Sequence, residues 1–471
     1  MHLIDALRLD HRARAALVGA GGKSAALFQL AREFTKPVIK SDRELVRAEL
    51  NAPAAVCLTT TTHLGIDQAN FADRHFILEG DHLPSFASEI DTPGVFLVTG
   101  TRSKQDRFGG LSMQAVGRLA QTIGPRIPLL IEADGSRQRP LKAPASHEPA
   151  IPEWVDLVAV VAGLSGLGKP LTDEWVHRPE LFGALAGLEP GALIGVTHLE
   201  RVLSHPEGGL KNIPNSARRI LILNQAQTDE LKSAAKSLSV SLLDFYEAVV
   251  IANLPAAIDS VEFPAPEAVI AVHERVAGVI LAAGASRRFG KLKQTLEWQG
   301  KPFVRLAAET ALAGGLRPVI VVVGNAATEV QNALNGLPVE VVYNAAWETG
   351  QSSSIKAGLG AVPGGTGAAM FLPVDKPRLP VSLLRSLVEL HSLELAPIVA
   401  PLVNGRRSNP VLFDRDMFEF LTTITGDIGG RELFSRFTPT WLPWNDPYDL
   451  QDIDTPADYA ALLNSHREVE D

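Results

Sequence analysis

Residues 278–293, GVILAAGASRRFGKLK, place an apolar run directly before a glycine-rich basic loop. The run from Val279 to Ala283 predicts a buried strand, and the loop after it carries four cations: Arg287, Arg288, Lys291 and Lys293. Backbone N–H groups in such a loop can approach a polyphosphate while the cations offset its negative charge. A strand that ends in a solvated basic turn is the structural alternative. The stretch therefore predicts phosphate chemistry in the C-terminal half of the chain.

A second candidate phosphate loop, GAGGKS, lies close to the N-terminus, between a predicted strand and a predicted helix. Its glycines allow a tight turn, its lysine supplies a phosphate-directed charge, and its serine hydroxyl suits a magnesium ion. The strict P-loop spacing requires glycine where the chain has Leu17, so the match is to a shorter loop. A purely structural turn is the alternative. The residues concerned are Gly19, Gly21, Gly22, Lys23 and Ser24.

Hydroxyl and carboxyl side chains follow two further apolar runs of the N-terminal half. Thr60 and Thr61 lie in a four-threonine run, and Glu132 and Asp134 follow the next buried strand that we predict. Open α/β sheets bind ligands at the carboxyl ends of their strands. Carboxylates in that place can hold Mg²⁺ or position a water beside a nucleotide. The alternatives are that the threonines only favour a strand and that the acids only cap a turn.

In the C-terminal half, Asp375 follows the apolar strand predicted at Ala368–Val374. A carboxylate at that sheet edge, beside a phosphate loop, is well placed to bind Mg²⁺. The serines of Gly350–Ser354 precede a helix predicted at Ile355–Leu359. They could cap this helix or contact a base or sugar.

Strands and helices alternate along the chain, which predicts parallel sheets with right-handed crossovers. In the N-terminal half the predicted strands include Leu193–Thr197 and Arg219–Asn224, and Asn224 could cap a loop or read a base edge. In the C-terminal half a helix at 303–313 precedes alternating elements at 318–324, 326–334 and 339–343. The predicted fold class is α/β, with two three-layer αβα domains.

Length and composition limit the possible functions. The 471 residues exceed one ordinary core, and two prolines in VEFPAPEAV indicate a linker, placed at 263–274 between domains 1–262 and 275–471. The net charge of −9 gives no support to a nucleic-acid partner, and no segment suits a membrane span. A single cysteine, Cys57, excludes an intrachain disulfide and multi-cysteine metal sites. A cytoplasmic protein that acts on small molecules is expected.

The basic loop of residues 281–293 matches the pattern L-A-A-G-x-S-x-R-x-G-x-x-K at every fixed position. It resembles the MobA-like NTP transferase family, and molybdenum cofactor cytidylyltransferases in particular. The resemblance implies a Rossmann-like nucleotidyltransferase fold. It also implies nucleotide binding by Leu281, Ala282, Ala283, Gly284, Ser286, Arg288, Gly290 and Lys293, and, through a G-Q-x-x-S segment, by Gln351, Ser352 and Ser354.

The same resemblance implies catalytic, metal and acceptor residues. Arg288, Lys293 and Asp375 would be catalytic, and a D-I-D-T-P element adds Asp452, the first choice, and Asp454 to Asp375 as Mg²⁺ ligands. Lys376 departs from the family's usual glutamine or methionine. The implied acceptor-binding residues are Arg407, Asn409 and Asp427, with Asn409 standing where histidine is usual.

The implied reaction transfers CMP from CTP to the phosphate of molybdenum cofactor (molybdopterin) and releases pyrophosphate. The sequence Ala282-Ala283-Gly284 favours CTP because guanylyl relatives commonly carry L-A-G-G at this point. A nucleotidyltransferase for a sugar or polyol phosphate is the alternative with the same chemistry.

Four segments of the N-terminal half, GAGGKS, TTTTHLG, EADGSRQRPLKAP and HEPAIP, resemble accessory proteins of selenium-dependent molybdenum hydroxylases, the YqeC family. The resemblance implies a P-loop-like domain that binds ATP or GTP. It also offers an opposite wall for that site: Lys142, His147, Glu148, His177 and Arg178. A nucleotide-dependent chaperone that delivers the cofactor to a molybdenum hydroxylase is therefore a further hypothesis.

Overall fold

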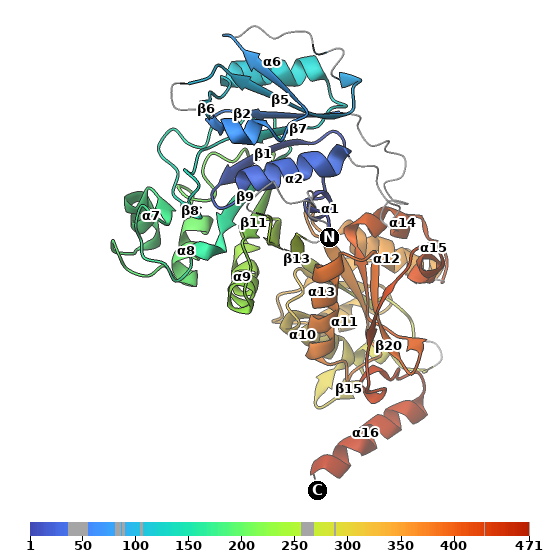
Figure 1. The fold of residues 1–471 in the computed structure, drawn as a ribbon. Coiled ribbons are helices and arrows are strands. Elements are labelled where there is room, and N and C mark those ends of the chain that lie inside the picture. The colour runs from blue at the N-terminus through green and yellow to red at the C-terminus, as the bar shows by residue number, and fades with distance from the viewer. Residues whose placement is uncertain are drawn as a thin grey trace. The chain divides into compact units, whose positions relative to one another are not determined.

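The computed structural model describes residues 1–35, 55–80, 86, 90–103, 107–255, 268–286, 289–427 and 429–470. These residues form two compact units, an N-terminal unit that ends at His273 and a C-terminal unit that begins at Glu274. Figure 1 shows each unit as a sheet flanked by helices. The predicted α/β class is confirmed for both units, and parallel pairing predominates in their main sheets.

A nine-stranded sheet in the order β13-β12-β11-β9-β1-β7-β2-β5-β4 forms the N-terminal unit. Its strands are β1 (Arg14–Gly19), β2 (Ala55–Thr60), β4 (Arg74–Leu78), β5 (Gly94–Gly100), β7 (Leu129–Glu132), β9 (Leu157–Gly163), β11 (Arg218–Asn224), β12 (Ala248–Ala252) and β13 (Val269–Glu274). The longer helices are α2 (Lys23–Thr35), α6 (Met113–Ile123), α7 (Pro179–Ala186), α8 (Val196–Ser204) and α9 (Asp229–Leu242). Shorter elements are α1 (Leu3–Ala6), α4 (Ile66–Ala69), β3 (Leu64–Gly65), β6 (Arg107–Phe108), β8 (Leu141–Lys142) and β10 (Val176–His177).

Helices cover both faces of this sheet. Ala16 and Val18 of β1 belong to a buried cluster that also contains residues of α6, α8 and α9. Because side chains alternate along a strand, Ala15 and Leu17 face the other side, where α2 packs on β1, β2, β5 and β7. Strands that are apolar on both faces, as β1 and β9 are, require this three-layer arrangement.

The C-terminal unit has a mixed sheet in the order β18-β17-β14-β19-β22-β20-β21, with β23 beside β20. Its strands are β14 (Val276–Ala282), β17 (Val319–Val323), β18 (Glu340–Tyr343), β19 (Ala368–Pro373), β20 (Ile398–Val403), β21 (Arg406–Arg407), β22 (Val411–Asp414) and β23 (Thr440–Pro443). A small hairpin joins β15 (Glu297–Trp298) and β16 (Lys301–Pro302). The helices are α10 (Phe303–Ala313), α11 (Ala327–Ala333), α12 (Gln351–Gly360), α13 (Val381–Glu394), α14 (Phe418–Thr423), α15 (Leu433–Arg436) and α16 (Pro456–Glu470).

Strand β14 lies at the centre of this second sheet. Ile280 and Ala282 pack in the cluster formed with α10 and α13, whereas Ala277 and Val279 pack in the cluster formed with α12 and α14. The strand is parallel to β17 on one side and to β19 on the other, so the order of the sheet reverses there. Ligands bind at the carboxyl ends of strands at such a switch point. The basic loop begins at this end of β14.

One predicted strand, Leu193–Thr197, is wrong. Leu193 makes only an isolated bridge to Pro170, and α8 begins at Val196. The buried residues of α8 are Leu199, Val202 and Leu203, a helical spacing that outweighs the short apolar run read as a strand.

The predicted linker at 263–274 contains a strand. Val269–Glu274 forms β13 at the edge of the N-terminal sheet, and residues 263–267 lie outside the described residues. The serines after Gly350 also differ from the prediction, because they lie inside α12. Within the described part of the chain, no helix is long and apolar enough to cross a membrane.

Candidate functional site

The loop after β14 is held by a buried glutamine. Gln294, 4% exposed, donates from Nε2 to the carbonyl oxygens of Ala282 (3.1 Å) and Gly284 (2.6 Å). Its Oε1 accepts from the Ser286 hydroxyl at 3.3 Å, and that hydroxyl oxygen accepts the Lys293 N–H at 3.1 Å. The loop conformation is therefore fixed by side chains. Gln294 was not predicted from the sequence, although its place directly after the last lysine of the pattern, Lys293, was the available signal.

The predicted nucleotide-binding residues of the basic loop begin at the carboxyl end of β14. Leu281 and Ala282 end β14, and Ala283 is buried beside them. Gly290 has a φ of +75°, and a Cβ added at Gly284 or Gly290 would meet no described heavy atom within 4 Å. No described atom outside the neighbouring residues therefore crowds the loop at these two glycines. Arg288 lies outside the described residues, so its predicted role stays a prediction.

Lys293 joins this loop to two of the predicted metal ligands. Its ammonium nitrogen lies 2.6 Å from Asp454 Oδ1 and 3.5 Å from Asp375 Oδ2. Asp375 follows β19, whereas Asp454 comes from the segment before α16. The fold therefore gathers a cation and two carboxylates from three distant parts of the sequence.

The third predicted ligand, Asp452, pairs with a different lysine. Lys376 Nζ lies 2.8 Å from Asp452 Oδ1 and also donates to the Leu450 carbonyl oxygen. The Ile453 N–H in turn donates to the Asp375 carbonyl oxygen at 2.9 Å. Burial and then the charge of Asp452 raise the pKa of Asp375, and Lys293 and Lys376 partly offset these effects.

These carboxylates suit a hard divalent cation only in part. Among the described residues, no three His, Cys, Asp or Glu side chains form a ready metal site. Mg²⁺ is commonly bound through one or two carboxylates together with substrate phosphates. Asp375 and Asp454, which share one ammonium partner, fit that pattern, whereas Asp452 is already engaged by Lys376.

The predicted nucleotide-contacting serines surround the start of α12. Asn344 donates from Nδ2 to the Ser353 hydroxyl (2.8 Å) and the Ser354 hydroxyl (3.0 Å), and Ser354 is buried. The Ser352 N–H donates to the Gly426 carbonyl oxygen at 3.1 Å. The Gln351 side chain lies against Gly429. The serines thus have structural partners, and contact with a nucleotide stays a prediction.

The predicted acceptor residues Asp427 and Arg407 contact different parts of the C-terminal unit. Asp427 Oδ1 accepts the N–H of Gln351 at 3.1 Å, so its carboxylate caps α12. The Arg407 guanidinium lies over the Phe434 ring at 4.9 Å, and that ring stacks on Trp441 with centroids 5.8 Å apart. Asn409 is exposed. The Asp427 carboxylate thus has a structural partner, and acceptor binding by Arg407, Asn409 and Asp427 stays a prediction.

The glycine loop of the N-terminal unit is tightly packed. Gly21 and Gly22 have φ values of +77° and +129°, and a Cβ on Gly21 would lie 2.4 Å from Gly163. Asn224 donates from Nδ2 to the Gly21 carbonyl oxygen at 2.8 Å and accepts the Leu254 N–H at 2.8 Å. The interpretation of Asn224 as a residue that holds a loop is the one that the structure supports.

Lys23 and Ser24 meet the two predicted carboxylates. Lys23 Nζ donates to the Gly19 carbonyl oxygen at 2.7 Å and lies 3.4 Å from Asp134 and 3.9 Å from Glu132. The Ser24 hydroxyl donates to Glu132 at 3.1 Å and accepts from Gln68 at 2.9 Å. Both Asp134 oxygens accept the Gly19 N–H. Burial raises the pKa of Glu132, and the charge of Lys23 and the hydrogen bond from Ser24 partly offset this rise. Gln68 was missed, because nothing in its local sequence indicates this contact.

The opposite wall implied by the resemblance is partly present as an ion-pair network. Lys142 Nζ donates to Asp134 (2.7 Å), Glu148 (2.9 Å) and the Gly135 carbonyl oxygen (2.8 Å). Arg178 makes a bidentate pair with Glu148 at 2.7 and 3.0 Å. The network connects the segment before α7 to the glycine loop through Asp134.

The other predicted residues of the N-terminal unit include Thr60, Thr61 and His177. Thr60 and Thr61 lie at the end of β2, and their hydroxyls donate to the carbonyl oxygens of Glu132 and Ala150. Burial, and then the charges of Arg178 and Lys142, lower the pKa of His177 to about 4. His177 is therefore neutral near pH 7.

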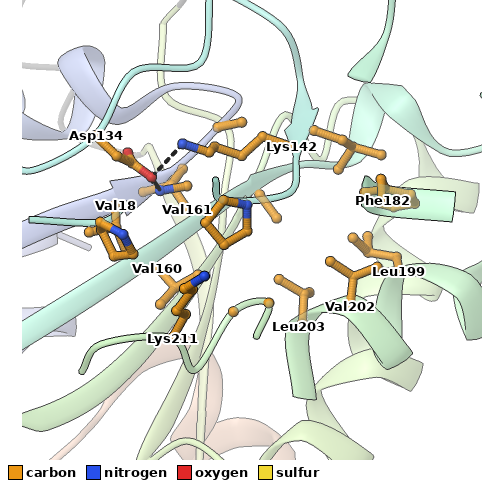
Figure 2. Close-up of a pocket in the computed structure, with 18 residues that line it drawn as sticks. Val18, Asp134, Lys142, Val160, Val161, Phe182, Leu199, Val202, Leu203 and Lys211 are labelled. Carbon is orange, nitrogen blue, oxygen red and sulfur yellow. Dashed lines mark hydrogen bonds and ion pairs between the residues drawn. The ribbon is translucent and has the colours of Figure 1, made fainter. Parts of the chain in front are cut away.

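Figure 2 shows a pocket whose lining includes Gly19 and Ala20 at the start of the glycine loop and residues of β1, β9, α7 and α8. Asp134 and Lys142 lie at one end of it and Lys211 at another, and most of the wall is apolar, with Phe182 and Leu199 prominent. Lys211 Nζ donates to the Ala145 carbonyl oxygen at 3.2 Å. The charged groups of the pocket, Asp134, Lys142 and Lys211, thus already have protein partners.

The network predicts how acid acts on the N-terminal unit. Burial opposes ionisation of Glu148, but the hydrogen bonds and charges of Arg178 and Lys142 outweigh it and lower the pKa to about 2. A folded-state pKa below the usual 4.5 means that Glu148 stabilises the fold above that value and that this stability is lost as the pH falls towards 2. We expect Glu148→Gln to flatten the pH dependence of urea unfolding between pH 5 and pH 2.5. Glu153→Gln, at an exposed site, should leave it as in the wild type.

Two family models match the chain. Residues 43–180 match the YqeC protein family, and residues 278–440 match the MobA-like NTP transferase domain. The matched regions contain Glu132 and Lys142 of the first unit and Lys293 and Asp375 of the second.

Relatives match each unit separately. The "Uncharacterized protein YqeC" of Escherichia coli K12 is 34% identical over 209 residues, which cover 44% of this chain and 74% of that protein. The "Nicotine blue oxidoreductase" of Paenarthrobacter nicotinovorans is 34% identical over 200 residues, covering 41% of this chain and 95% of that protein. The "Molybdenum cofactor cytidylyltransferase" of Escherichia coli K12 is 24% identical over 192 residues, which cover 41% of this chain and 97% of that protein.

The C-terminal unit thus joins a parallel switch-point strand, a basic glycine loop and a lysine shared by two carboxylates to a match with a nucleotidyltransferase domain. These features are those of a nucleotidyltransferase enzyme. The chain belongs to the YqeC protein family through its N-terminal unit and to the MobA-like NTP transferase family through its C-terminal unit.

Proposed function

We propose that the C-terminal unit transfers CMP from CTP to the phosphate of molybdenum cofactor and releases pyrophosphate. One observation carries the proposal: Lys293 lies at the phosphate loop and contacts both Asp375 and Asp454. A relative named molybdenum cofactor cytidylyltransferase supports the choice of acceptor. The sequence Ala282-Ala283-Gly284 at the end of β14 supports CTP as the donor.

The protein residues position the reactants and offset charge. Backbone groups of the loop fixed by Gln294 hold the triphosphate, and Lys293, with Arg288 from the sequence prediction, offsets its charge. Mg²⁺, held by Asp375 and Asp454, would supply charge neutralisation at the phosphates. An acceptor phosphate oxygen attacks the α-phosphorus of CTP, the bond to the β-phosphate oxygen breaks, and pyrophosphate leaves. This displacement requires no protein nucleophile.

Arg407 is the residue that we assign to the acceptor. Its guanidinium lies over the Phe434 ring, which stacks on Trp441, and the Arg407 side chain is exposed. Such a surface suits a planar ring with an attached phosphate. Asn409, which lies two residues further along, can donate and accept hydrogen bonds there.

Pyrophosphate release by the full-length chain tests the reaction. CTP, GTP and ATP are supplied in turn with molybdenum cofactor, or with a sugar phosphate or polyol phosphate as acceptor. Release with CTP and molybdenum cofactor alone supports the proposal. Release with a sugar or polyol phosphate instead favours the second candidate of the same chemistry, and no release with any pair refutes both.

For the N-terminal unit we propose binding of ATP or GTP at the loop from Gly19 to Ser24. The supporting observation is the contact of Lys23 and Ser24 with two buried carboxylates, Glu132 and Asp134, at the end of strand β7. Bound nucleotide would serve delivery of the cofactor to a molybdenum hydroxylase, the partner that the resemblance implies.

Lys23→Ala should weaken binding of ATP or GTP by at least tenfold, because it removes the charge closest to the loop. Titration calorimetry on the full-length chain measures this. Lys169→Ala, which removes an ammonium group that lies over the Trp175 ring, is the matched control. It should leave the affinity for ATP and GTP unchanged. Equal affinity in wild type and Lys23→Ala would show that the glycine turn is only structural.

A further inference from the structure

Lys376 is a buried lysine that directly follows the central carboxylate of the C-terminal site. Its side chain is 1% exposed and sits next to Asp375 in the sequence. A buried ammonium requires partners for its charge and its three donors. It finds them in Asp452, at 2.8 Å, and in the Leu450 carbonyl oxygen.

These two partners lie in the segment that carries Asp454. The segment is also attached to the end of β19 by the Ile453 N–H, which donates to the Asp375 carbonyl oxygen. Ile453 itself is buried in the core of the unit. Lys376 and Ile453 therefore fix the same short segment from both sides of Asp452.

The three carboxylates are not equivalent in this arrangement. Asp375 and Asp454 contact Lys293, whose side chain is 14% exposed and whose backbone N–H donates to Ser286 of the loop. Asp452 contacts Lys376, which is out of reach of solvent. An incoming divalent cation can exchange with the accessible Lys293, but at Asp452 it would have to leave a buried ammonium without its counter-ion, which is costly.

We infer that Lys376 is a positioning residue, the permanent counter-ion of Asp452, which withholds this carboxylate from metal coordination and holds residues 450–454 against β19 before a cation binds. The divalent cation is then bound by Asp375 and Asp454 alone. The inference rests on the proposed function for the existence of a metal site, but the role of Lys376 in the metal-free protein is independent of it.

The first test uses Mn²⁺ as the probe, with binding to the full-length chain followed by electron paramagnetic resonance without nucleotide. We expect Asp375→Asn and Asp454→Asn to raise the Kd for Mn²⁺ by about tenfold or more, because each removes a ligand, and Asp452→Asn to raise it by clearly less, because that substitution only loosens the segment that carries Asp454. An Asp452→Asn variant that weakens Mn²⁺ binding as much as Asp375→Asn does would overturn the inference.

The second test is amide hydrogen exchange of the segment 450–455 in chelator-treated protein. Lys376→Met should speed exchange there by about tenfold, because it removes the contacts that hold the segment. Lys301→Met, which removes an exposed lysine paired with Glu309, is the matched control. Unchanged exchange in Lys376→Met contradicts the inference, whether or not the wild type binds Mn²⁺.

A double mutant separates the ion pair from simple packing. If Lys376 acts through Asp452, the variant Lys376→Met/Asp452→Asn should exchange no faster than Lys376→Met alone. Additive effects of the two substitutions would show that the lysine acts only through the Leu450 carbonyl and would refute its role as counter-ion. A wild type that fails to bind Mn²⁺, with these exchange results intact, would count against the proposed function and leave the role of Lys376 standing.

Discussion

Replacing Asp375 with asparagine should lower kcat/KM for pyrophosphate release by on the order of 10²- to 10³-fold. Asp375 has the least exposed side chain of the three carboxylates, 28% against 51% for Asp452 and 55% for Asp454. Its carboxylate faces Lys293 and its carbonyl oxygen anchors Ile453, so the amide removes charge without removing the anchor. Steady-state kinetics with CTP and molybdenum cofactor measures the effect.

The control for this substitution removes a carboxylate elsewhere in the same unit. Glu419→Gln, on an exposed position of α14, should retain wild-type kinetics. Thermal unfolding of both variants should match the wild type, because the Asp375 side chain has no structural partner other than Lys293 among its described ion pairs. Activity of Asp375→Asn within about threefold of wild type would remove Asp375 from the reaction.

Replacing Lys142 with methionine should lower the free energy of unfolding of the N-terminal unit by about 3–5 kcal/mol. The Lys142 side chain is 3% exposed, and its ammonium satisfies Asp134, Glu148 and the Gly135 carbonyl oxygen. Methionine fills similar space but leaves these acceptors without their shared cation. Because two units unfold in one chain, urea unfolding should be followed by hydrogen exchange of β9 rather than by a single global signal.

An exposed lysine in the same unit, Lys232, provides a control for the loss of unfolding free energy expected from Lys142→Met. Lys232→Met, which breaks an ion pair with Asp229 on the surface of α9, should cost less than about 1 kcal/mol. A second substitution, Asp134→Asn in the Lys142→Met background, should recover part of the loss because it removes the uncompensated charge. If Lys142→Met lowers the free energy of unfolding as little as Lys232→Met does, the buried network contributes little to the stability of the N-terminal unit.

Much of the fold followed from local patterns. Apolar runs such as Val319–Val323 and Leu129–Glu132 are strands because buried parallel strands are apolar on both faces, and the helix at Phe303–Ala313 has its predicted bounds. The prediction of a strand at Leu193–Thr197 failed, because α8 begins at Val196 and the buried residues of that helix have helical spacing. A run of that length fits both periods until its neighbours are known.

Some residues of the candidate sites could also be predicted from local sequence patterns, whereas others could not. Strand-end carboxylates and glycine loops could be predicted because parallel strands bring their carboxyl ends to one sheet edge. The roles of Gln294 and Asp427 could not be, since a glutamine in a 3₁₀ turn and an aspartate between glycines have the same local sequence whether they bind ligands or hold the chain.

The sequence by itself determined two phosphate-loop candidates, the α/β class and the identities of the acidic residues, because each depends on short-range spacing. Only the tertiary structure decided which lysine each carboxylate meets: Lys293 contacts Asp454 across 161 positions, and Lys376 takes Asp452 instead. The physical reason is that charge pairing depends on distance in space and on burial. Neither quantity is encoded in the spacing of two residues that come from separate loops at the end of one sheet.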